Sequence, residues 1–237
     1  MPLYTLSPRL AACASLLRPG RALIDVGTDH AYLPIWLLKA GLIPQAVACD
    51  VKPGPLKAAQ RHAKLYQVGE ELRLVLSDGL QALGPADGDD IVIAGMGGEL
   101  ILRIITETRW LRAPGKRLIL QPMSAAGKLR GGLWELGFPI IKEEAVQDGK
   151  KVYSAFAVSY TGQLPAAPPL YITMGRLMPG EPGVSAYAVK TVRELMKRLQ
   201  GAEHEGDTET AQSLRQEIEE IARKYPIETG GAYGKNL

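Results

Sequence analysis

Short apolar runs rich in β-branched residues alternate with segments of helical spacing between residues 22 and 160. Each run has the length of a strand, and most are followed by a loop and a segment whose apolar residues recur every three or four positions. The alternation is typical of a doubly wound α/β sheet. The predicted strands cover residues 22–26, 45–50, 73–77, 90–94, 117–120, 139–146 and 151–159.

The last two predicted strands are separated only by Gln147-Asp-Gly-Lys150. An Asp-Gly pair between two strands favours a tight turn, because glycine reaches the positive φ angles that such turns need. We therefore expect a largely parallel sheet that ends in an antiparallel hairpin.

A stretch rich in proline and glycine, residues 161–169, interrupts every periodic pattern. We expect a boundary there, between one domain of residues 1–162 and a linker with a helical hairpin in residues 163–237. In the second part, apolar residues at 3-4 spacing predict two helices packed along a seam. They are Val189, Val192, Met196 and Leu199 in the first helix, and Ala211, Leu214, Ile218, Ile221 and Tyr225 in the second.

The two predicted helices differ in charge, and the chain can turn between Gly201 and Gly206. We expect the basic residues of the first helix to form ion pairs with the acidic residues of the second; contact with RNA is the alternative interpretation. The residues concerned are Lys190, Arg193, Lys197 and Arg198 in the first helix, and Glu217, Glu219 and Glu220 in the second.

The composition is that of a folded, soluble protein, because 46% of the 237 residues are hydrophobic. We find no secretory signal and no apolar run near the ~18 residues of a membrane-spanning helix, so we expect a cytoplasmic protein without membrane contact. Cys13 and Cys49 have apolar neighbours, which favours two buried thiols, and we expect no bound metal. The net charge of +3 is too small to identify a nucleic-acid-binding protein by itself.

The segment Asp25-Val-Gly-Thr-Asp-His-Ala31 includes the end of the first predicted strand and the turn that follows it. A glycine turn in this place is typical of a nucleotide-type site. Asp29, however, stands where a dinucleotide fingerprint has its second glycine, and a carboxylate there would repel a pyrophosphate. S-adenosylmethionine has a ribose and an adenine but a positive sulfonium in place of phosphates, so methyl transfer is the leading hypothesis.

Acidic side chains end the next two predicted strands. Asp50 lies 23 residues after Gly27, close to the offset at which a carboxylate accepts hydrogen bonds from ribose hydroxyls. Asp78, in Ser77-Asp-Gly79, could bind the exocyclic amine of adenine or could simply shape a turn.

Glycines follow the fourth predicted strand in Gly95-Met-Gly-Gly98. They allow the backbone to approach a planar group, or alternatively a neighbouring helix. Gln121 ends the fifth strand at the same edge and can both donate and accept hydrogen bonds. His30 is the histidine best placed for chemistry, although a capping or core role fits it equally well, and His62 is interpreted as an ordinary helix residue.

Together these motifs resemble those of the bacterial tRNA (adenine-N1)-methyltransferases of the TrmK type, which modify the adenine at tRNA position 22. The resemblance covers most of the chain, and the pairing of Gly-Thr-Asp-His-Ala-Tyr-Leu-Pro with Gly-Met-Gly-Gly makes it specific. Met123 departs from the family, in which asparagine is expected after Gln-Pro. The motifs are Leu6-Ser-Pro-Arg-Leu10, Asp25-Val-Gly-Thr-Asp-His-Ala-Tyr-Leu-Pro34, Gly54-Pro-Leu56, Ser77-Asp-Gly79, Gly95-Met-Gly-Gly98 and Leu120-Gln-Pro122.

The resemblance implies a class I, Rossmann-like methyltransferase sheet with a C-terminal coiled-coil hairpin, working as a monomer on tRNA. It places Asp29 beside the target base, where its carboxylate would accept a hydrogen bond from the N6 amine. The residues expected to bind S-adenosyl-L-methionine are Asp25, Gly27, Thr28, His30, Asp50, Val51, Asp78, Gly79, Gly95 and Met96. Those expected to contact the substrate are Arg9, Tyr32, Gly97, Gly98, Gln121 and Pro122.

Two other functions stay open at this point. The core motifs alone also permit a methyltransferase that acts on a small molecule or a protein, whose activity would be insensitive to salt. A non-catalytic RNA-binding or assembly protein, in which the helical hairpin is the working part, would not bind the cofactor.

Overall fold

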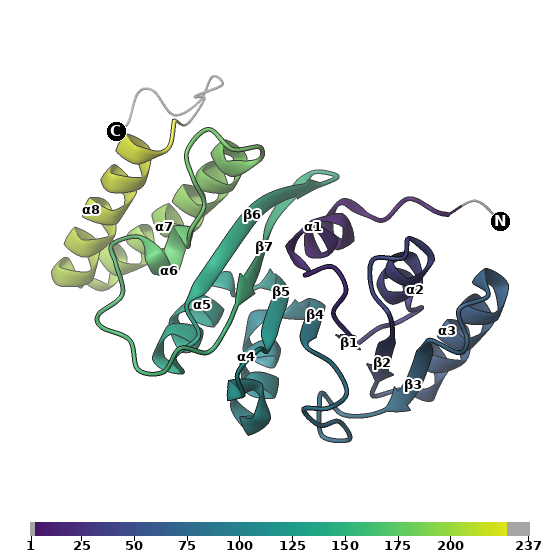
Figure 1. Ribbon diagram of the computed structural model, residues 1–237. Coiled ribbons are helices and arrows are strands. Elements are labelled where there is room, and N and C mark those ends of the chain that lie inside the picture. Colours follow the sequence, from purple (N-terminus) through teal and green to yellow (C-terminus); the bar gives the residue numbers. More distant parts are fainter. Residues whose placement is uncertain (1–2, 227–237) are drawn as a thin grey trace.

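Seven strands form one sheet in the computed structural model, which describes residues 3–226 (Figure 1). They are β1 (Leu23–Val26), β2 (Ala46–Asp50), β3 (Leu72–Leu76), β4 (Asp90–Gly97), β5 (Arg117–Ser124), β6 (Ile140–Asp148) and β7 (Lys151–Val158). Their spatial order is β3-β2-β1-β4-β5-β7-β6. Strands β1 to β5 are parallel, and β7 runs antiparallel to both β5 and β6. The expected parallel sheet with a terminal antiparallel hairpin is confirmed.

Helices cover both faces of this sheet. They are α1 (Pro8–Leu16), α2 (Tyr32–Lys39), α3 (Pro53–Tyr66), α4 (Gly98–Glu107), the 3₁₀ turn η1 (Arg109–Arg112), α5 (Ala126–Glu135) and the short α6 (Tyr171–Met174). Side chains of a strand point alternately to the two faces. Ile24 and Val26 of β1 thus pack with α4 and α5, whereas Leu23 packs with α1, α2 and α3. Burial on both sides explains why the central strands read as continuous apolar runs.

The first helix, α1, was not predicted as an element, although the sequence contains its start signal. The Ser7 hydroxyl accepts a hydrogen bond from the Leu10 amide at 3.4 Å, and Pro8 occupies the first helical position. Serine before proline is a favourable beginning for a helix, because proline lacks the amide that would otherwise need a partner. The helix carries Arg9 and buries Cys13, which is free and buried like Cys49, as predicted.

Strands β4 and β5 are longer than predicted. The glycine-rich segment was expected to form a loop after Ala94, but β4 continues through Gly97 and β5 through Ser124. Pairing persists because irregularities around Met96 let the chain bulge while Met96 lies opposite Pro122. Gln121 and Pro122 are therefore strand residues rather than loop residues, and the predicted ends at residues 94 and 120 were wrong.

The C-terminal hairpin consists of α7 (Val184–Glu205) and α8 (Thr208–Lys224) (Figure 1). The predicted seam is confirmed, since buried residues of both helices, including Leu195 and Ile218, form a separate apolar cluster. Gly201 was expected in the connection but lies inside α7. The turn falls instead at Gly206, and the Asp207 carboxylate accepts the Thr210 amide at 3.0 Å to cap α8.

The charge pairing expected between the two helices is wrong for Lys190 and Lys197. The ion pair recorded between them has the opposite polarity, from Arg215 of α8 to Glu203 of α7. Lys190 instead lies 3.8 Å from Glu194 of its own helix. Within residues 3–226, Lys197 has no carboxylate at ion-pairing distance. No helix of the described chain is long and apolar enough to span a membrane.

Arg130 of α5 connects the sheet to the C-terminal helices. Its side chain is fully buried and pairs with the equally buried Glu143 of β6 at 2.6 Å. It also donates hydrogen bonds to the Ser154 hydroxyl at 3.1 Å, to the Tyr187 hydroxyl of α7 at 2.8 Å and to the carbonyl oxygen of Thr173 at 2.9 Å. Because one guanidinium bonds to groups on β6, β7, α6 and α7, it fixes the hairpin against the sheet.

We predict that Arg130→Met destabilises the protein by about 3 to 5 kcal/mol, because it leaves the Glu143 carboxylate buried and unpaired. The double variant Arg130→Met/Glu143→Leu should recover most of that loss, since the buried charge is then removed as well. Urea unfolding measures both values. Lys128→Ala, which changes a residue of the same helix and removes its exposed ion pair with Glu99 of α4, is the control and should barely move the midpoint. Equal losses in the single and double variants would contradict this account.

Candidate active site at the carboxyl edge of the sheet

A cavity of about 240 Å³ opens where strand order reverses, between the carboxyl ends of β1 and β4. Open α/β sheets bind their ligands at such a reversal, because the loops that follow the two strands diverge. Many of the predicted site residues line it, and they come from α1, from β1 and the turn after it, from the start of α2, and from β4 and β5. They are Arg9, Asp25, Gly27, Thr28, Asp29, Tyr32, Gly95 and Gln121.

The turn after β1 is tightly constrained. The amides of Gly27 and Thr28 both donate to the Cys49 carbonyl oxygen of β2, at 2.8 and 3.0 Å. Gly27 has φ +71°, and a Cβ on it would lie 2.1 Å from the Met96 Cε. The positive φ favours glycine there, and any side chain would also have to displace the Met96 methyl group. Asp29 also has a positive φ, +53°, a conformation that aspartate tolerates better than most residues.

Asp25 is a buried carboxylate at the base of the cavity. Its side chain accepts a hydrogen bond from the Thr28 hydroxyl at 2.5 Å. Burial raises the pKa of Asp25 to about 6, the nearby Asp50 carboxylate acts in the same direction, and the Thr28 hydrogen bond opposes both. Asp25 and Thr28 thus form the floor beneath the turn.

Asp50 ends β2 beside this turn and is half-buried. One carboxylate oxygen accepts the Lys52 amide at 2.9 Å, and the other accepts the Asp29 amide at 3.4 Å. The second contact is long and therefore weak. A carboxylate has about four acceptor positions, so Asp50 keeps capacity for a pair of ligand hydroxyls.

The edge continues along β2 and β3 with apolar and acidic side chains. Val51 and Leu76 are more than half exposed, although both are apolar. Asp78 is also about half exposed and lies 3.7 Å from Arg103. The structure places Asp78 and Gly79 in a neighbouring cavity of about 650 Å³, not in the 240 Å³ cavity. Leu76 was missed from the sequence because it reads as an ordinary strand residue.

Asp29 and His30 lie at the mouth of the cavity. The Asp29 carboxylate is 70% exposed and lies 3.4 Å from the His30 Nε2. The His30 Nδ1 is buried and has no hydrogen-bond partner among the described residues. His30 does not line the 240 Å³ cavity itself, and its ring belongs to an aromatic group beside the mouth.

Five rings form that group. The Tyr32 ring centroid is 5.1 Å from His62, 5.5 Å from His30 and 5.3 Å from Tyr4, and Tyr66 adjoins Tyr4 at 5.2 Å. His62 was interpreted as an ordinary helix residue, but its Nδ1 lies 3.1 Å from the His30 carbonyl oxygen. The four-residue spacing of His62 and Tyr66 on α3 was the available signal, because that spacing puts both on one helix face.

The glycines after β4 divide between two roles. Gly95 has φ +76° and no atom in the space that a Cβ would take, so it leaves the cavity open. Gly98 is a packing glycine, because a Cβ there would meet the Ala125 carbonyl oxygen at 2.6 Å. Gln121 is fully buried: its Oε1 accepts the Gly95 amide at 3.2 Å and its Nε2 donates to the Pro122 carbonyl oxygen. Gln121 thus shapes the Gly95 bulge.

Arg9 lies between the cavity and the β6–β7 hairpin. Its Nε donates to the Asp148 carboxylate at 2.6 Å, and its guanidinium lies 5.5 Å from the centre of the Tyr153 ring. Its Nη1 also donates to the Met123 sulfur at 3.0 Å. Met123 therefore makes a polar contact despite its departure from the family's asparagine, although a thioether is a weak acceptor.

Comparisons with known proteins agree with this geometry. The family described as "Methyltransferase domain" matches residues 6–156. The tRNA (adenine(22)-N(1))-methyltransferase of Bacillus subtilis is 32% identical over 162 residues, which cover 68% of this chain and 68% of that protein. This chain belongs to the tRNA (adenine(22)-N(1))-methyltransferase family.

Similarity to a solved structure extends into the helical hairpin, since it covers 92% of the chain. The structure of a candidate tRNA (m1A22) methyltransferase from Streptococcus pneumoniae has a TM-score of 0.80 and 34% identity, and covers 92% of this chain and 99% of that one. The same protein has also been solved with S-adenosyl-L-methionine, at a TM-score of 0.73. The ribosomal protein L11 methyltransferase of Geobacillus kaustophilus, by contrast, is 30% identical over only 59% of this chain and 44% of that protein.

We predict that Asp25 makes stability depend on pH. The folded state binds the Asp25 proton more tightly than the unfolded chain does, so this contribution to stability is complete below about pH 4 and lost as pH rises through about 6. Asp25→Asn keeps an acceptor for the Thr28 hydroxyl but cannot ionise. The free energy of unfolding of Asp25→Asn minus that of the wild type should therefore increase by about 2 to 3 kcal/mol when the pH rises from 4 to 7. Urea unfolding over that range measures the difference, and a pH-independent difference would contradict the buried carboxyl.

Proposed function

We propose that this protein transfers a methyl group from S-adenosyl-L-methionine to N1 of the adenine at position 22 of tRNA. The whole-chain match to a structure of this family carries the proposal, because that match includes the helical hairpin. Similarity to the ribosomal protein L11 methyltransferase covers little more than half of the chain.

We further propose that residues 1–162 form the catalytic domain and that residues 163–237 form a linker and the helical hairpin. We propose that the protein works in the cytoplasm as a monomer, with tRNA as its partner.

The residues at the carboxyl edge fit S-adenosyl-L-methionine better than a dinucleotide. The carboxylates of Asp25 and Asp29 would repel a pyrophosphate but favour a positive sulfonium. Asp50 has acceptor capacity for both ribose hydroxyls. The exposed apolar surface of Val51 and Leu76 suits the adenine faces. When bound, S-adenosyl-L-methionine supplies an electrophilic methyl group on a positively charged sulfur.

The protein's own task is then to orient the target base and stabilise its charge. Adenine N1 has a lone pair and needs no deprotonation, so alignment replaces general-base catalysis. We assign the Asp29 carboxylate to the N6 amine, which becomes more acidic as N1 gains positive charge, so the hydrogen bond strengthens in the transition state. His30, 3.4 Å away, can hold this carboxylate in place.

Adenine N1 lies on the pairing edge, so the base must leave its stack before it can react. The rings of Tyr32, His30 and His62 lie together beside the mouth of the cavity. We assign them to stacking against the exposed base or its neighbour, an interaction worth about 1 to 3 kcal/mol per base. Gly95 provides open space at the opposite wall.

We predict that Asp50→Ala weakens binding of S-adenosyl-L-methionine by about 10- to 100-fold, because hydrogen bonds to a charged acceptor are worth about 1.5 to 3 kcal/mol. Isothermal titration calorimetry measures the change. Glu70→Ala, which removes an exposed carboxylate from the opposite edge of the sheet, is the control and should bind like the wild type. An unchanged dissociation constant for Asp50→Ala would place the cofactor elsewhere.

We predict that Asp29→Asn lowers kcat on a tRNA transcript with adenine at position 22 by about 100-fold or more, in line with the loss of one preorganised group. Asparagine tolerates the positive φ of residue 29, so the turn should persist, and binding of S-adenosyl-L-methionine by calorimetry should stay within about 3-fold, a small change on the tenfold-per-1.4-kcal/mol scale. Full turnover by Asp29→Asn would eliminate the proposed role of the carboxylate.

A further inference from the structure

The histidine of α3, His62, contacts the turn that carries Asp29, although the two residues are far apart in the sequence. The His62 Nδ1 lies 3.1 Å from the carbonyl oxygen of His30. A carbonyl oxygen can only accept a hydrogen bond, so the Nδ1 carries the hydrogen and donates it. The His62 ring is half-buried, and its centroid lies 5.5 Å from that of the His30 ring. Helix α3 is thus bonded to the segment that joins β1 to α2.

The sequence leaves the His30 carbonyl oxygen without a partner in the helix that follows it. In an α-helix, a carbonyl oxygen accepts the amide of the fourth residue after it. That residue is Pro34, and proline has no amide hydrogen. The carbonyl oxygen of Ala31, one residue later, has its helical partner, because the Ile35 amide donates to it at 3.1 Å. The His62 ring therefore supplies the hydrogen bond that Pro34 cannot supply.

The turn that His62 contacts is strained on both sides of His30. Asp29 has φ +53° and Ala31 has φ +56°. A side chain makes this left-handed conformation unfavourable, and alanine lacks the local hydrogen bonds with which aspartate offsets part of the cost. Such residues persist only where the surrounding contacts hold them. One of these contacts is the Ala31 amide, which donates to the Thr28 carbonyl oxygen at 2.9 Å, and the other is the bond from His62.

The position of the Asp29 carboxylate depends on the backbone of this turn. Its side chain is 70% exposed, so packing does little to orient it. His30, which lies 3.4 Å from the carboxylate, belongs to the same turn and would move with it. The Asp29 amide reaches the Asp50 carboxylate only at 3.4 Å, which is a weak contact. The bond from α3 is therefore the strongest recorded contact that ties the Asp29–His30 part of the turn to a separate element.

We propose that His62 is a positioning residue for methyl transfer, because its hydrogen bond to the His30 carbonyl oxygen holds the turn so that the Asp29 carboxylate faces the target base. The inference rests on the proposed function, which assigns Asp29 to the N6 amine of that base. It goes beyond the stacking assigned to the His62 ring, since the two roles use different parts of the side chain. The hydrogen on Nδ1 orients the turn, and the face of the ring contacts a base.

Two variants of the full-length protein separate these roles. His62→Asn keeps a donor, because the amide nitrogen of asparagine stands where histidine has its Nδ1, but it has no ring. His62→Phe keeps an aromatic ring but has no donor. Gln60→Ala, which changes an exposed residue of α3, is the control. The measurements are kcat and KM for a tRNA transcript with adenine at position 22, at saturating S-adenosyl-L-methionine.

We expect His62→Phe to lower kcat by about 10-fold and to change KM by less than about 3-fold, because a misplaced carboxylate weakens the transition state more than substrate binding. His62→Asn should keep kcat within about 3-fold of the wild type and raise KM by about 5-fold or more, since it loses a stacking surface. Gln60→Ala should match the wild type. Equal values of kcat in the asparagine and phenylalanine variants would overturn the proposal.

Binding of S-adenosyl-L-methionine, measured by calorimetry, tests whether the effect is confined to the substrate side. The amides of Gly27 and Thr28 are held separately by the Cys49 carbonyl oxygen of β2. Both His62 variants should therefore bind the cofactor within about 3-fold of the wild type, a small change on the tenfold-per-1.4-kcal/mol scale. Loss of cofactor binding that parallels the loss of kcat in His62→Phe would contradict a role in positioning Asp29.

Hydrogen exchange examines the turn without methyl transfer, so failures of the two proposals are distinguishable. The Ala31 amide should exchange about 10-fold faster in His62→Phe than in His62→Asn or the wild type, because the turn opens more often. This pattern, with a wild type that methylates no tRNA, would retain the role of His62 in the turn and reject the proposed function. Equal exchange in all variants, with a wild type that methylates adenine 22, would reject the positioning role alone.

Discussion

The reversal of strand order between β1 and β4 is the constraint on which the site depends. The chain leaves β1 toward β2 and β3 but builds β4 and β5 on the other side, so the following loops diverge and leave an opening at the carboxyl edge. The Gly27 turn and the Gly95 bulge face each other across this opening, and the Met96 methyl group packs against Gly27. A side chain at residue 27 would have to displace that methyl group.

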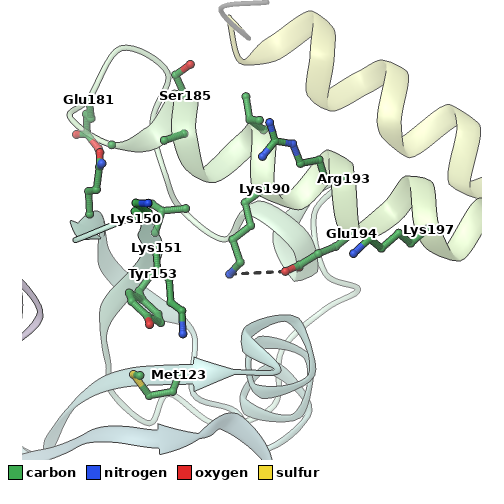
Figure 2. Close-up of a pocket in the computed structure, with 15 residues that line it drawn as sticks. Met123, Lys150, Lys151, Tyr153, Glu181, Ser185, Lys190, Arg193, Glu194 and Lys197 are labelled. Atoms are coloured by element: carbon green, nitrogen blue, oxygen red, sulfur yellow. Dashed lines mark ion pairs between the residues drawn. The ribbon is translucent and has the colours of Figure 1, made fainter. Parts of the chain in front are cut away.

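A second constraint places the helical hairpin. A helix as long as α7 could pack against the sheet at many angles. Arg130 bonds to Glu143, Ser154 and Tyr187 at the same time, which restricts α7 to a few of these angles. Buried ion pairs contribute little net stability and can specify one arrangement among several. A cavity of about 940 Å³ lies between the two parts, with one wall from the β6–β7 hairpin of the sheet and the other from α7 (Figure 2).

The sequence predicted the strands and the helical hairpin, because local periodicity and turn chemistry determine them. It also brought Asp25, Gly27 and Gly95 to one edge of the sheet, where the structure has them, and their roles stay predictions. Strand ends at β4 and β5 were wrong, since pairing beyond a bulge depends on the neighbouring strand. The buried Arg130–Glu143 pair was not predicted, because arginine and glutamate are usually exposed and nothing in the local sequence marks these two as buried. The ring group around Tyr32 combines residues from the N-terminus, the first turn and α3, and no local pattern brings Tyr4, Tyr32 and Tyr66 together.

The most direct test of the central claim is to map the methylated position on tRNA treated with the protein and S-adenosyl-L-methionine. A methyl group at adenine N1 blocks base pairing, so reverse transcription should stop one nucleotide before position 22. The account predicts this stop in a transcript with adenine at position 22, and no stop when guanine replaces it or when the cofactor is omitted. A stop at another adenine, or full-length reverse transcripts from protein that binds the cofactor, would contradict the assignment.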